Sequence, residues 1–284
     1  MSGSSHALKA PGLIRRLGAW PAYAALALFV LLPLAGLVLE LIWDDTDIVS
    51  RVREDRLVMA ALANTLALGA GTASVSLIVG ALLARSVARL GARKRQLMIV
   101  LLGVPLTFSG LVIAYGFILA FGRAGVITQL LALAGANPAE VGKWIYTTAG
   151  LAFAYAYYLV PRVALILVPL FANLDRRPFQ AALTLGAPPW RAWLDTDFRE
   201  LAPSFAAVWC LICAVAMGTY GTALALAGTQ INILPLLIFL KISDGGGDFP
   251  MAAALSLLLL AACLLVLGLG EALTRGRDKH PVNG

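Results

Sequence analysis

Arg162 is the outstanding polar residue inside the long apolar runs of this 284-residue sequence. Tyr155, Tyr158 and Arg162 are spaced at i, i+3 and i+7, so one face of a helix carries all three. A permanent cation without a carboxylate partner favours an anion such as a phosphonate, phosphate or sulfate over a polyamine. Four further polar residues are expected at a similar depth and complete the candidate substrate path: Thr107, Ser109, Thr219 and Tyr220.

The depth of Arg162 has two explanations. An arginine near the middle of a membrane helix costs about 2.5 to 3.5 kcal/mol on insertion scales, so it is not expected to face lipid. It either lines a polar cavity, or it extends toward the cytoplasm or pairs with a carbonyl group and serves packing. Pro161 beside it should bend the helix. Glu40 and Glu271 lie at the ends of apolar runs, so we expect no deep carboxylate to neutralise the arginine.

The sequence offers little for catalysis. Cys210 and Cys213 form a C-x-x-C pair, which in a soluble protein suggests redox chemistry or zinc binding. Within an apolar helix, and without a second ligand pair, packing is the better interpretation. His6 and His280 lie in the terminal tails. No G-x-x-x-x-G-K-[ST] motif occurs, so any ATP must be bound by a partner. We expect no catalytic residue, no metal site and no cofactor.

Composition identifies the elements that must position these residues. Hydrophobic residues make up 60% of the chain and charged residues 13%, against about 25% charged in soluble domains. Six apolar runs are long enough to span a membrane, and they are continuous rather than alternating, which indicates helices rather than barrel strands. The first exceeds the usual apolar core of a signal peptide, so we expect it to be retained. The predicted fold is an all-α integral membrane protein with runs at 20–42, 58–83, 97–121, 147–171, 204–228 and 251–273.

The distribution of basic residues predicts the topology. Most of the 22 Lys and Arg residues lie in both tails, between the second and third runs, and between the fourth and fifth. The positive-inside rule places these parts in the cytoplasm, with both termini inside. The net charge of +7 therefore reflects topology, and no nucleic-acid partner is expected. The predicted division is a cytoplasmic tail (1–19), a first transmembrane helix with its outer loop (20–56), the main transmembrane domain (57–273) and a second cytoplasmic tail (274–284).

Three smaller features accompany the spans. The outer segment "DDTDIVSRVREDR" (44–56) is expected to form a short surface helix, and "TQINILPLLIFLKISDGGGDF" (229–249) a re-entrant or interfacial half-helix. Ala63, Ala67 and Gly71 recur every four residues. Such a stripe lets helix backbones approach closely, although alanine is common throughout this chain.

The cytoplasmic segment "FQAALTLGAPPWRAWLDTDFRELAPS" (179–204) interrupts the apolar pattern. It predicts two short helices joined by a rigid elbow. Gly186 is placed as a left-handed C-terminal cap, and Pro188 and Pro189 stop one helix and start the next. Trp190 and Trp193 lie on the apolar face of the second, amphipathic helix. They anchor either a protein partner or the lipid headgroups.

This segment resembles the EAA motif of the permease subunits of type I, binding-protein-dependent ABC importers. Gln180, Ala181, Ala182 and Gly186 match its first, second, third and seventh places, with Gln180 replacing the usual acid. The I-x-L-P that normally follows is replaced by residues 196–199. The wider chain resembles the same family from about residue 57 to 273. The resemblance implies that these residues couple to an ATPase: Gln180, Ala181, Ala182, Gly186, Ala187, Pro188, Trp190 and Trp193.

The resemblance also implies partners and an activity. The chain would be a non-catalytic, multi-pass subunit of the bacterial inner membrane. It would work with two cytoplasmic ABC ATPase subunits, a second permease subunit of the same or a different kind, an extracytoplasmic solute-binding protein and membrane lipid. It would import a small hydrophilic solute by alternating access. Segments of the chain look intermediate between polyamine or phosphonate importers and oxyanion importers, which favours a phosphonate such as 2-aminoethylphosphonate or an inorganic oxyanion. The alternatives are a polyamine (spermidine or putrescine), ferric iron, or a stand-alone channel or secondary transporter.

Overall fold

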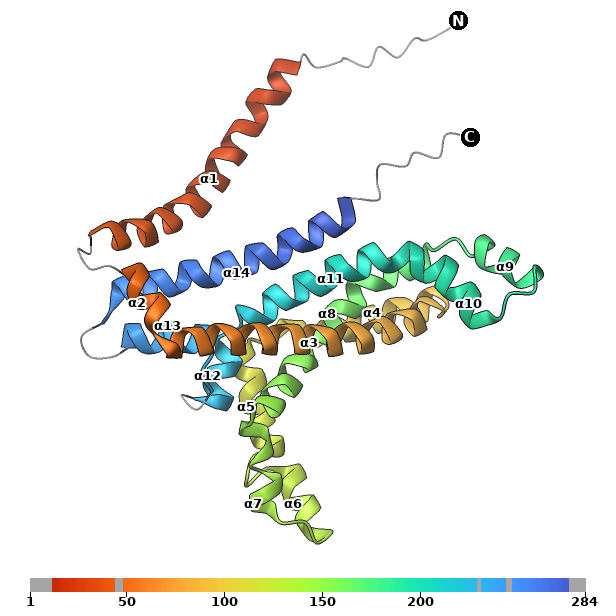
Figure 1. Ribbon diagram of the computed structural model, residues 1–284. Coiled ribbons are helices and arrows are strands. Elements are labelled where there is room, and N and C mark those ends of the chain that lie inside the picture. Colours follow the sequence, from red (N-terminus) through yellow and green to blue (C-terminus); the bar gives the residue numbers. More distant parts are fainter. Residues whose placement is uncertain (1–11, 44–47, 229–230, 244–246, 276–284) are drawn as a thin grey trace, which may run out of the picture.

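The computed structural model describes residues 12–43, 48–228, 231–243 and 247–275, and throughout these ranges the chain is helical or irregular, with no strand. The predicted all-α membrane fold is confirmed (Figure 1). The helices are α1 (Gly12–Trp43), α2 (Ile48–Glu54), α3 (Arg56–Ala88), α4 (Ala92–Thr107), α5 (Gly110–Phe121), α6 (Val126–Leu133), α7 (Pro138–Val141), η1 (Trp144–Tyr146), α8 (Thr148–Ala172), α9 (Arg177–Thr184), α10 (Pro189–Trp193), η2 (Leu194–Phe198), α11 (Arg199–Met217), α12 (Gly221–Ala227), α13 (Leu234–Ser243) and α14 (Phe249–Arg275).

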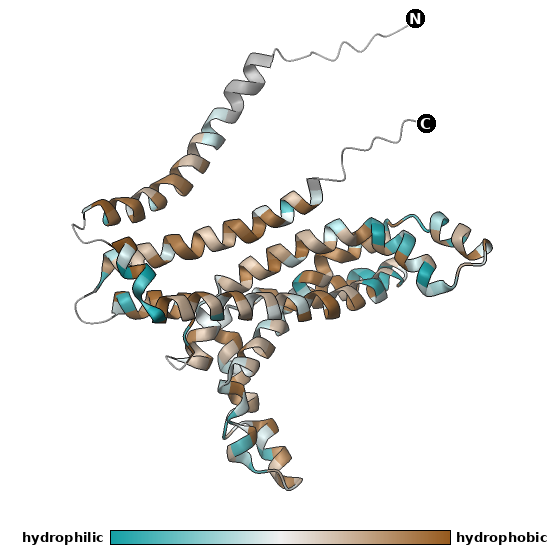
Figure 2. Ribbon diagram, in the orientation of Figure 1, coloured by the Kyte–Doolittle hydropathy of each residue, from teal (hydrophilic) through white to brown (hydrophobic). Residues whose placement is uncertain are grey.

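Six helical stretches in the described ranges are long and apolar enough to cross a membrane. They are Tyr23–Trp43, Arg56–Ala88, Gly110–Leu133, Thr148–Ala172, Pro189–Met217 and Phe249–Thr274. Figure 2 shows hydrophobic residues along the long helices, and hydrophilic residues gathered at α2 and around α9 and α10. Because the basic loops adjoin α9 and α10, this end of the bundle is the cytoplasmic one. Helix α1 begins at Gly12, eight residues before the predicted start of the first run, while His6 and His280 lie outside the described residues.

The core of the bundle is built by α3, α8 and α11, with α4 against α8 and α14 against α11 (Figure 1). Helix α1 lies on the outside and contacts α14. The central position of α8 agrees with its burial, because eleven of its 25 residues are buried, among them the fully buried Leu151, Leu159 and Leu167. The same helix carries Arg162, so the packing of α8 fixes where that charge lies.

The close packing of α3 on α8 depends on Gly80. A Cβ atom at this position would lie 2.6 Å from Val163 Cγ1 and 3.0 Å from the Val160 carbonyl oxygen. We therefore expect Gly80→Ala to lower stability by about 1 to 3 kcal/mol, because the backbone contact cannot yield without moving the helix. Thermal unfolding of the purified complex measures this loss. Gly268→Ala is the matched control, since a Cβ there meets no atom within 4 Å; equal losses in the two variants would contradict the assignment.

Two predicted spans are interrupted, and the prediction of continuous helices at 97–121 and 204–228 is wrong. The first is divided between α4 and α5 at Phe108 and Ser109, both extended, and Ser109 caps α5 by accepting from the Val112 N–H at 3.4 Å. The second ends at Met217 and restarts as α12 at Gly221. A hydrogen bond connects the two interrupted spans next to their breaks, because the Thr222 hydroxyl donates to the Gly110 carbonyl oxygen at 3.0 Å.

Each of the two predicted outer segments contains a short helix, α2 in the first and α13 in the second, although residues 44–47, 229–230 and 244–246 of these segments lie outside the described ranges. Asp55 caps α3 by accepting from the Leu57 N–H at 2.8 Å. Arg51 forms a 2.9 Å ion pair with Asp248, which joins α2 to the segment before α14.

Candidate functional site

Arg162 lines a cavity of about 220 Å³, here called the Arg162 cavity. Three parts of the chain form its wall: α8, the end of α11, and the break between α4 and α5. The lining residues are Pro105, Leu106, Phe108, Gly110, Ile113, Tyr158, Arg162, Val215 and Thr219. Because both interrupted spans contribute at their breaks, the cavity exists only because those helices are discontinuous. Non-helical backbone is tolerated at this depth where it lines a cavity of this kind.

Hydrogen bonds from two tyrosines position Thr219 at the edge of the cavity. The Tyr155 hydroxyl donates to the Thr219 carbonyl oxygen at 2.8 Å, and the Tyr158 hydroxyl donates to Thr219 Oγ1 at 3.3 Å. The Thr219 hydroxyl in turn donates to the Val215 carbonyl oxygen at 2.8 Å. Tyr155 is fully buried behind the wall, whereas Tyr158 reaches the cavity. Tyr155 therefore holds the break after α11 in place, while Tyr158 lines the cavity with its hydroxyl bonded to Thr219.

We expect Tyr155→Phe to destabilise the protein by about 1 to 3 kcal/mol. The substitution leaves the Thr219 carbonyl, a buried group in a helix break, without its donor. The midpoint of thermal unfolding should fall accordingly. Tyr157→Phe is the matched control on the same helix, because its ring is 45% exposed and its hydroxyl makes none of these bonds. A midpoint unchanged in Tyr155→Phe would show that the bond contributes nothing.

The charge of Arg162 is not neutralised. The side chain is half-buried, and among the described residues no acid pairs with its guanidinium and no group accepts a hydrogen bond from it. Helix α5 begins at the same cavity, and the N-terminal end of a helix favours negative charge. The Arg162 guanidinium therefore supplies the free charged donors suited to an oxyanion. The Tyr158 phenol and the Thr219 hydroxyl beside it already donate within the chain.

The other predicted path residues lie outside this wall. Thr107 is exposed and its hydroxyl donates to the Val104 carbonyl oxygen at 2.7 Å. Ser109 is used as the cap of α5. Tyr220 packs against the ring of Phe239 on α13, with centroids 5.3 Å apart. Of the seven residues, the structure brings Arg162, Tyr158 and Thr219 together in the cavity, with Tyr155 behind them.

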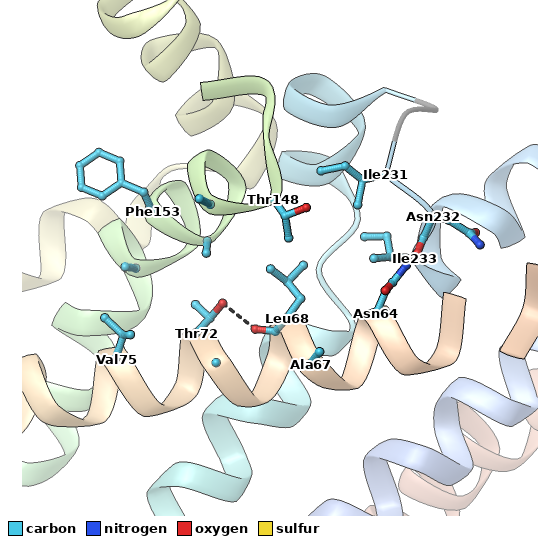
Figure 3. A pocket seen from close by; sticks show the side chains of 14 residues that line it. Asn64, Ala67, Leu68, Thr72, Val75, Thr148, Phe153, Ile231, Asn232 and Ile233 are labelled. Atoms are coloured by element: carbon cyan, nitrogen blue, oxygen red, sulfur yellow. Dashed lines mark hydrogen bonds between the residues drawn. The ribbon is translucent and has the colours of Figure 1, made fainter. Parts of the chain in front are cut away.

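A second hollow, a groove of about 810 Å³, runs between α3, α8 and the segment before α13 (Figure 3). Small residues of the two helices form its floor, among them Ala67 and Gly71 of the stripe noted in the sequence. No atom lies within 4 Å of a Cβ built at Gly71, so this part of the stripe is open, and Gly80 makes the close approach instead. Sequence reasoning missed the groove. The stripe of small residues was the signal in the sequence for this groove. Such a stripe alone, however, does not show whether another helix packs against it or leaves it open.

The outer end of this groove is pinned by amide side chains. Asn64 Nδ2 donates to the Asn232 carbonyl oxygen, and Asn232 Nδ2 donates to the Leu57 carbonyl oxygen, both at 2.9 Å. The backbone N–H of Leu234 donates to Thr65 Oγ1, also at 2.9 Å. Figure 3 shows Asn64 and Asn232 together at this end. These bonds fasten the start of α13 to α3.

At the cytoplasmic end, the segment 177–198, here called the coupling loop, has the predicted elbow. Helix α9 ends before Gly186, which adopts a left-handed φ of +88°. The Ala187 N–H donates back to the Ala182 carbonyl oxygen at 3.1 Å, as expected of this type of cap. Pro188 caps α10 in extended backbone and Pro189 begins it. The predicted separate second helix is wrong, however. It continues through one π-helical turn, η2, into α11, so Pro189–Met217 is one uninterrupted rod.

The two tryptophans of the coupling loop have different surroundings. Trp190 is 66% exposed, and Leu185 beside the elbow is 88% exposed. Trp193 instead packs within the chain: its ring is 5.4 Å from that of Phe198, and the guanidinium carbon of Arg85 lies 5.6 Å from its centroid. Leu185 and Trp190 are therefore the most exposed large apolar side chains of the coupling loop, while Trp193 contacts Arg85 of α3. An amphipathic pattern treats both tryptophans alike and cannot separate them.

The cysteines are packing residues in this structure. A Cβ at Gly270 would lie 2.9 Å from Cys210 Sγ, and one at Gly69 would lie 3.4 Å from Cys213 Sγ. Both thiols thus fill the spaces where α14 and α3 approach α11. No cluster of three or more His, Cys, Asp or Glu side chains that could hold a metal occurs within the described ranges.

No protein-family model matches the chain. The sulfate transport system permease protein CysT of Escherichia coli (strain K12) is 29% identical over 261 residues, covering 90% of each chain. The molybdenum transport system permease protein ModB of Mycobacterium tuberculosis (strain ATCC 25618 / H37Rv) is 32% identical over 201 residues, covering 69% of this chain and 71% of that protein.

Among solved structures, a chain of a bacterial alginate ABC transporter in complex with an alginate pentasaccharide-bound periplasmic protein superimposes with a TM-score of 0.76. The match covers 95% of this chain and 96% of that chain. At 14% sequence identity, this match supports the fold alone.

Proposed function

Because this chain belongs to the permease family of type I ABC importers, a family of multi-pass inner-membrane proteins, we propose that it carries a tetrahedral oxyanion of the sulfate or molybdate class into the cell. The observation that carries the proposal is the unpaired guanidinium of Arg162 in a cavity shared with Tyr158 and Thr219. Relatives named for sulfate and molybdenum transport support it independently.

The chemistry of the cavity separates the candidate solutes. A phosphonate presents the same kind of charged oxygen group as sulfate and would meet the same donors. A polyamine or ferric iron is a cation and would be repelled by Arg162, because no described carboxylate lines the cavity. A channel or secondary transporter working alone would have no use for the elbow of the coupling loop, and family membership argues against it.

The power for this transport would come from partner subunits. In our proposal two ATPase subunits receive the coupling loop at Leu185 and Trp190, a second permease subunit completes the path, and a binding protein delivers the solute at the outer face. The rod Pro189–Met217 has 29 residues and is about 43 Å long. It ends at Met217, two residues before the cavity residue Thr219, so one continuous helical element connects Trp190 with the solute site.

The test is the solute dependence of ATP hydrolysis. The complex of permease and ATPase subunits is purified and mixed with the binding protein loaded with sulfate, molybdate, 2-aminoethylphosphonate, spermidine or ferric iron. We expect stimulation by an oxyanion-loaded binding protein and none by spermidine or ferric iron. Stimulation by a cationic solute alone would refute the proposal for the solute while leaving the family assignment intact.

A further inference from the structure

Three arginines surround a small cavity at the cytoplasmic end of the bundle, here called the arginine pocket. Its volume is about 290 Å³, and it lies between the ends of α3 and α8 and the segment that leads to α9. The lining residues are Arg85, Ala88, Arg89, Phe171, Ala172, Leu174 and Arg176. The pocket shares no residue with the Arg162 cavity or with the groove along α3.

The positive charges of this pocket are not balanced. Arg85 experiences the like charges of Arg89 and Arg176, and only Asp197 opposes them. None of the three arginines forms an ion pair with an acid in the described part of the chain. The C-terminal end of α3 favours cations and so accounts for Arg85 and Arg89. It does not account for Arg176, which enters from another segment.

The remaining wall of the pocket is apolar. Phe171, Ala172 and Leu174 face the arginines where α8 ends. A site that is basic on one side and apolar on the other, at the level where helices leave the membrane, suits an anionic group attached to or bordering the lipid phase. Arginine guanidinium groups bind phosphate oxygens through paired hydrogen bonds.

We propose that the arginine pocket binds a phosphate-type oxyanion, either the phosphodiester of an anionic phospholipid headgroup or a free oxyanion from the cytoplasm. The pocket is separate from the solute path, so the inference goes beyond the proposed function. Its occupation has a mechanical effect, because Arg85 also lies over the ring of Trp193 on the rod. An anion that neutralises the repulsion among the arginines holds Arg85 in this contact and stiffens the attachment of the rod to α3.

The experiment uses the whole importer complex in lipid nanodiscs of phosphatidylcholine with a minority of phosphatidylglycerol. The test variant is Arg89→Gln with Arg176→Gln, which leaves the contact of Arg85 with Trp193 intact. The matched control is Arg93→Gln with Lys94→Gln, two exposed basic residues at the start of α4 that do not line the pocket. Native mass spectrometry measures the phosphatidylglycerol retained, and in nanodiscs of phosphatidylcholine alone, added inorganic phosphate is tested for a rise in the midpoint of thermal unfolding.

A lipid occupant predicts retention of phosphatidylglycerol that falls about fivefold for each arginine removed, with no fall in the control. A free oxyanion predicts instead that phosphate raises the midpoint in the natural sequence and the control but not in the test variant. Either result supports the site and identifies its source. The proposal is overturned if natural and test proteins behave alike in both arms, or if the control loses as much lipid as the test variant. Neither measurement requires transport, so its failure is distinct from failure of the proposed function.

Discussion

Replacing Arg162 with leucine should lower solute uptake about a hundredfold. Among the described residues the guanidinium is the one charged group that lines the Arg162 cavity, and a charge-assisted hydrogen bond contributes about 1.5 to 3 kcal/mol. Loss of about 3 kcal/mol of binding in the path corresponds to roughly two orders of magnitude. Uptake of labelled sulfate or molybdate into vesicles that contain the reconstituted importer measures the effect. Arg162→Lys keeps the charge but not the planar pair of donors, so it should retain part of the activity.

Stability distinguishes this role from packing. An arginine inside a membrane helix costs about 2.5 to 3.5 kcal/mol on insertion scales, and leucine removes that cost. If Arg162 serves the solute, Arg162→Leu is at least as stable as the natural protein while its uptake is lost. If Arg162 serves packing, its replacement lowers the thermal midpoint, and any loss of uptake follows from unfolding. Unchanged uptake in a well-assembled Arg162→Leu complex would remove the argument for an anion.

Replacing Trp190 with alanine should release the ATPase subunit. Large aromatic side chains at the centre of an interface contribute about 2 kcal/mol or more, so affinity should fall about 30-fold or more. The permease itself should stay folded, because Trp190 is 66% exposed and supports little within the chain. Retention of the ATPase subunit on the immobilised permease, together with transport, measures the loss.

Two other tryptophans make this prediction specific. Trp20 on α1 is 70% exposed, so Trp20→Ala removes an equally accessible indole away from the coupling loop and should leave ATPase retention unchanged. Trp193→Ala removes the ring beneath Arg85 and should weaken the attachment of the rod to α3. It should therefore reduce transport more than ATPase retention. If Trp190→Ala retains the ATPase fully while crosslinks from this position capture phospholipid alone, the coupling loop is an interfacial anchor.

Much of the fold could be predicted from composition and periodicity, because a membrane span is a local property of about 20 residues. The interruptions at Phe108 and Gly218 could not. Their local signals, a serine cap and a helix-ending glycine, are short and stand between long apolar stretches. Their stabilisation comes from the bond between Thr222 and Gly110, two residues far apart in the chain.

The candidate site was predictable where its members share one helix. Tyr158 and Arg162 are four residues apart on α8, so the sequence alone places them on the same helix face. Thr219 reaches them only because α11 stops at Met217, and its bonds to the tyrosines depend on that break. Trp190 and Trp193 differ because Trp193 contacts Arg85 of α3. The sequence pattern of the coupling loop does not predict this contact.

Helix α3 couples movements at the outer and cytoplasmic ends of the bundle. It has 33 residues without a proline and is about 50 Å long. Near its outer end Asn64 and Thr65 hold the segment before α13, and near its inner end Arg85 lies over Trp193. Helix α3 thus connects a segment at the outer face of the membrane with the rod at the cytoplasmic face. If α3 tilts about its contact with α8, the segment before α13 and the Trp193 contact move in opposite directions.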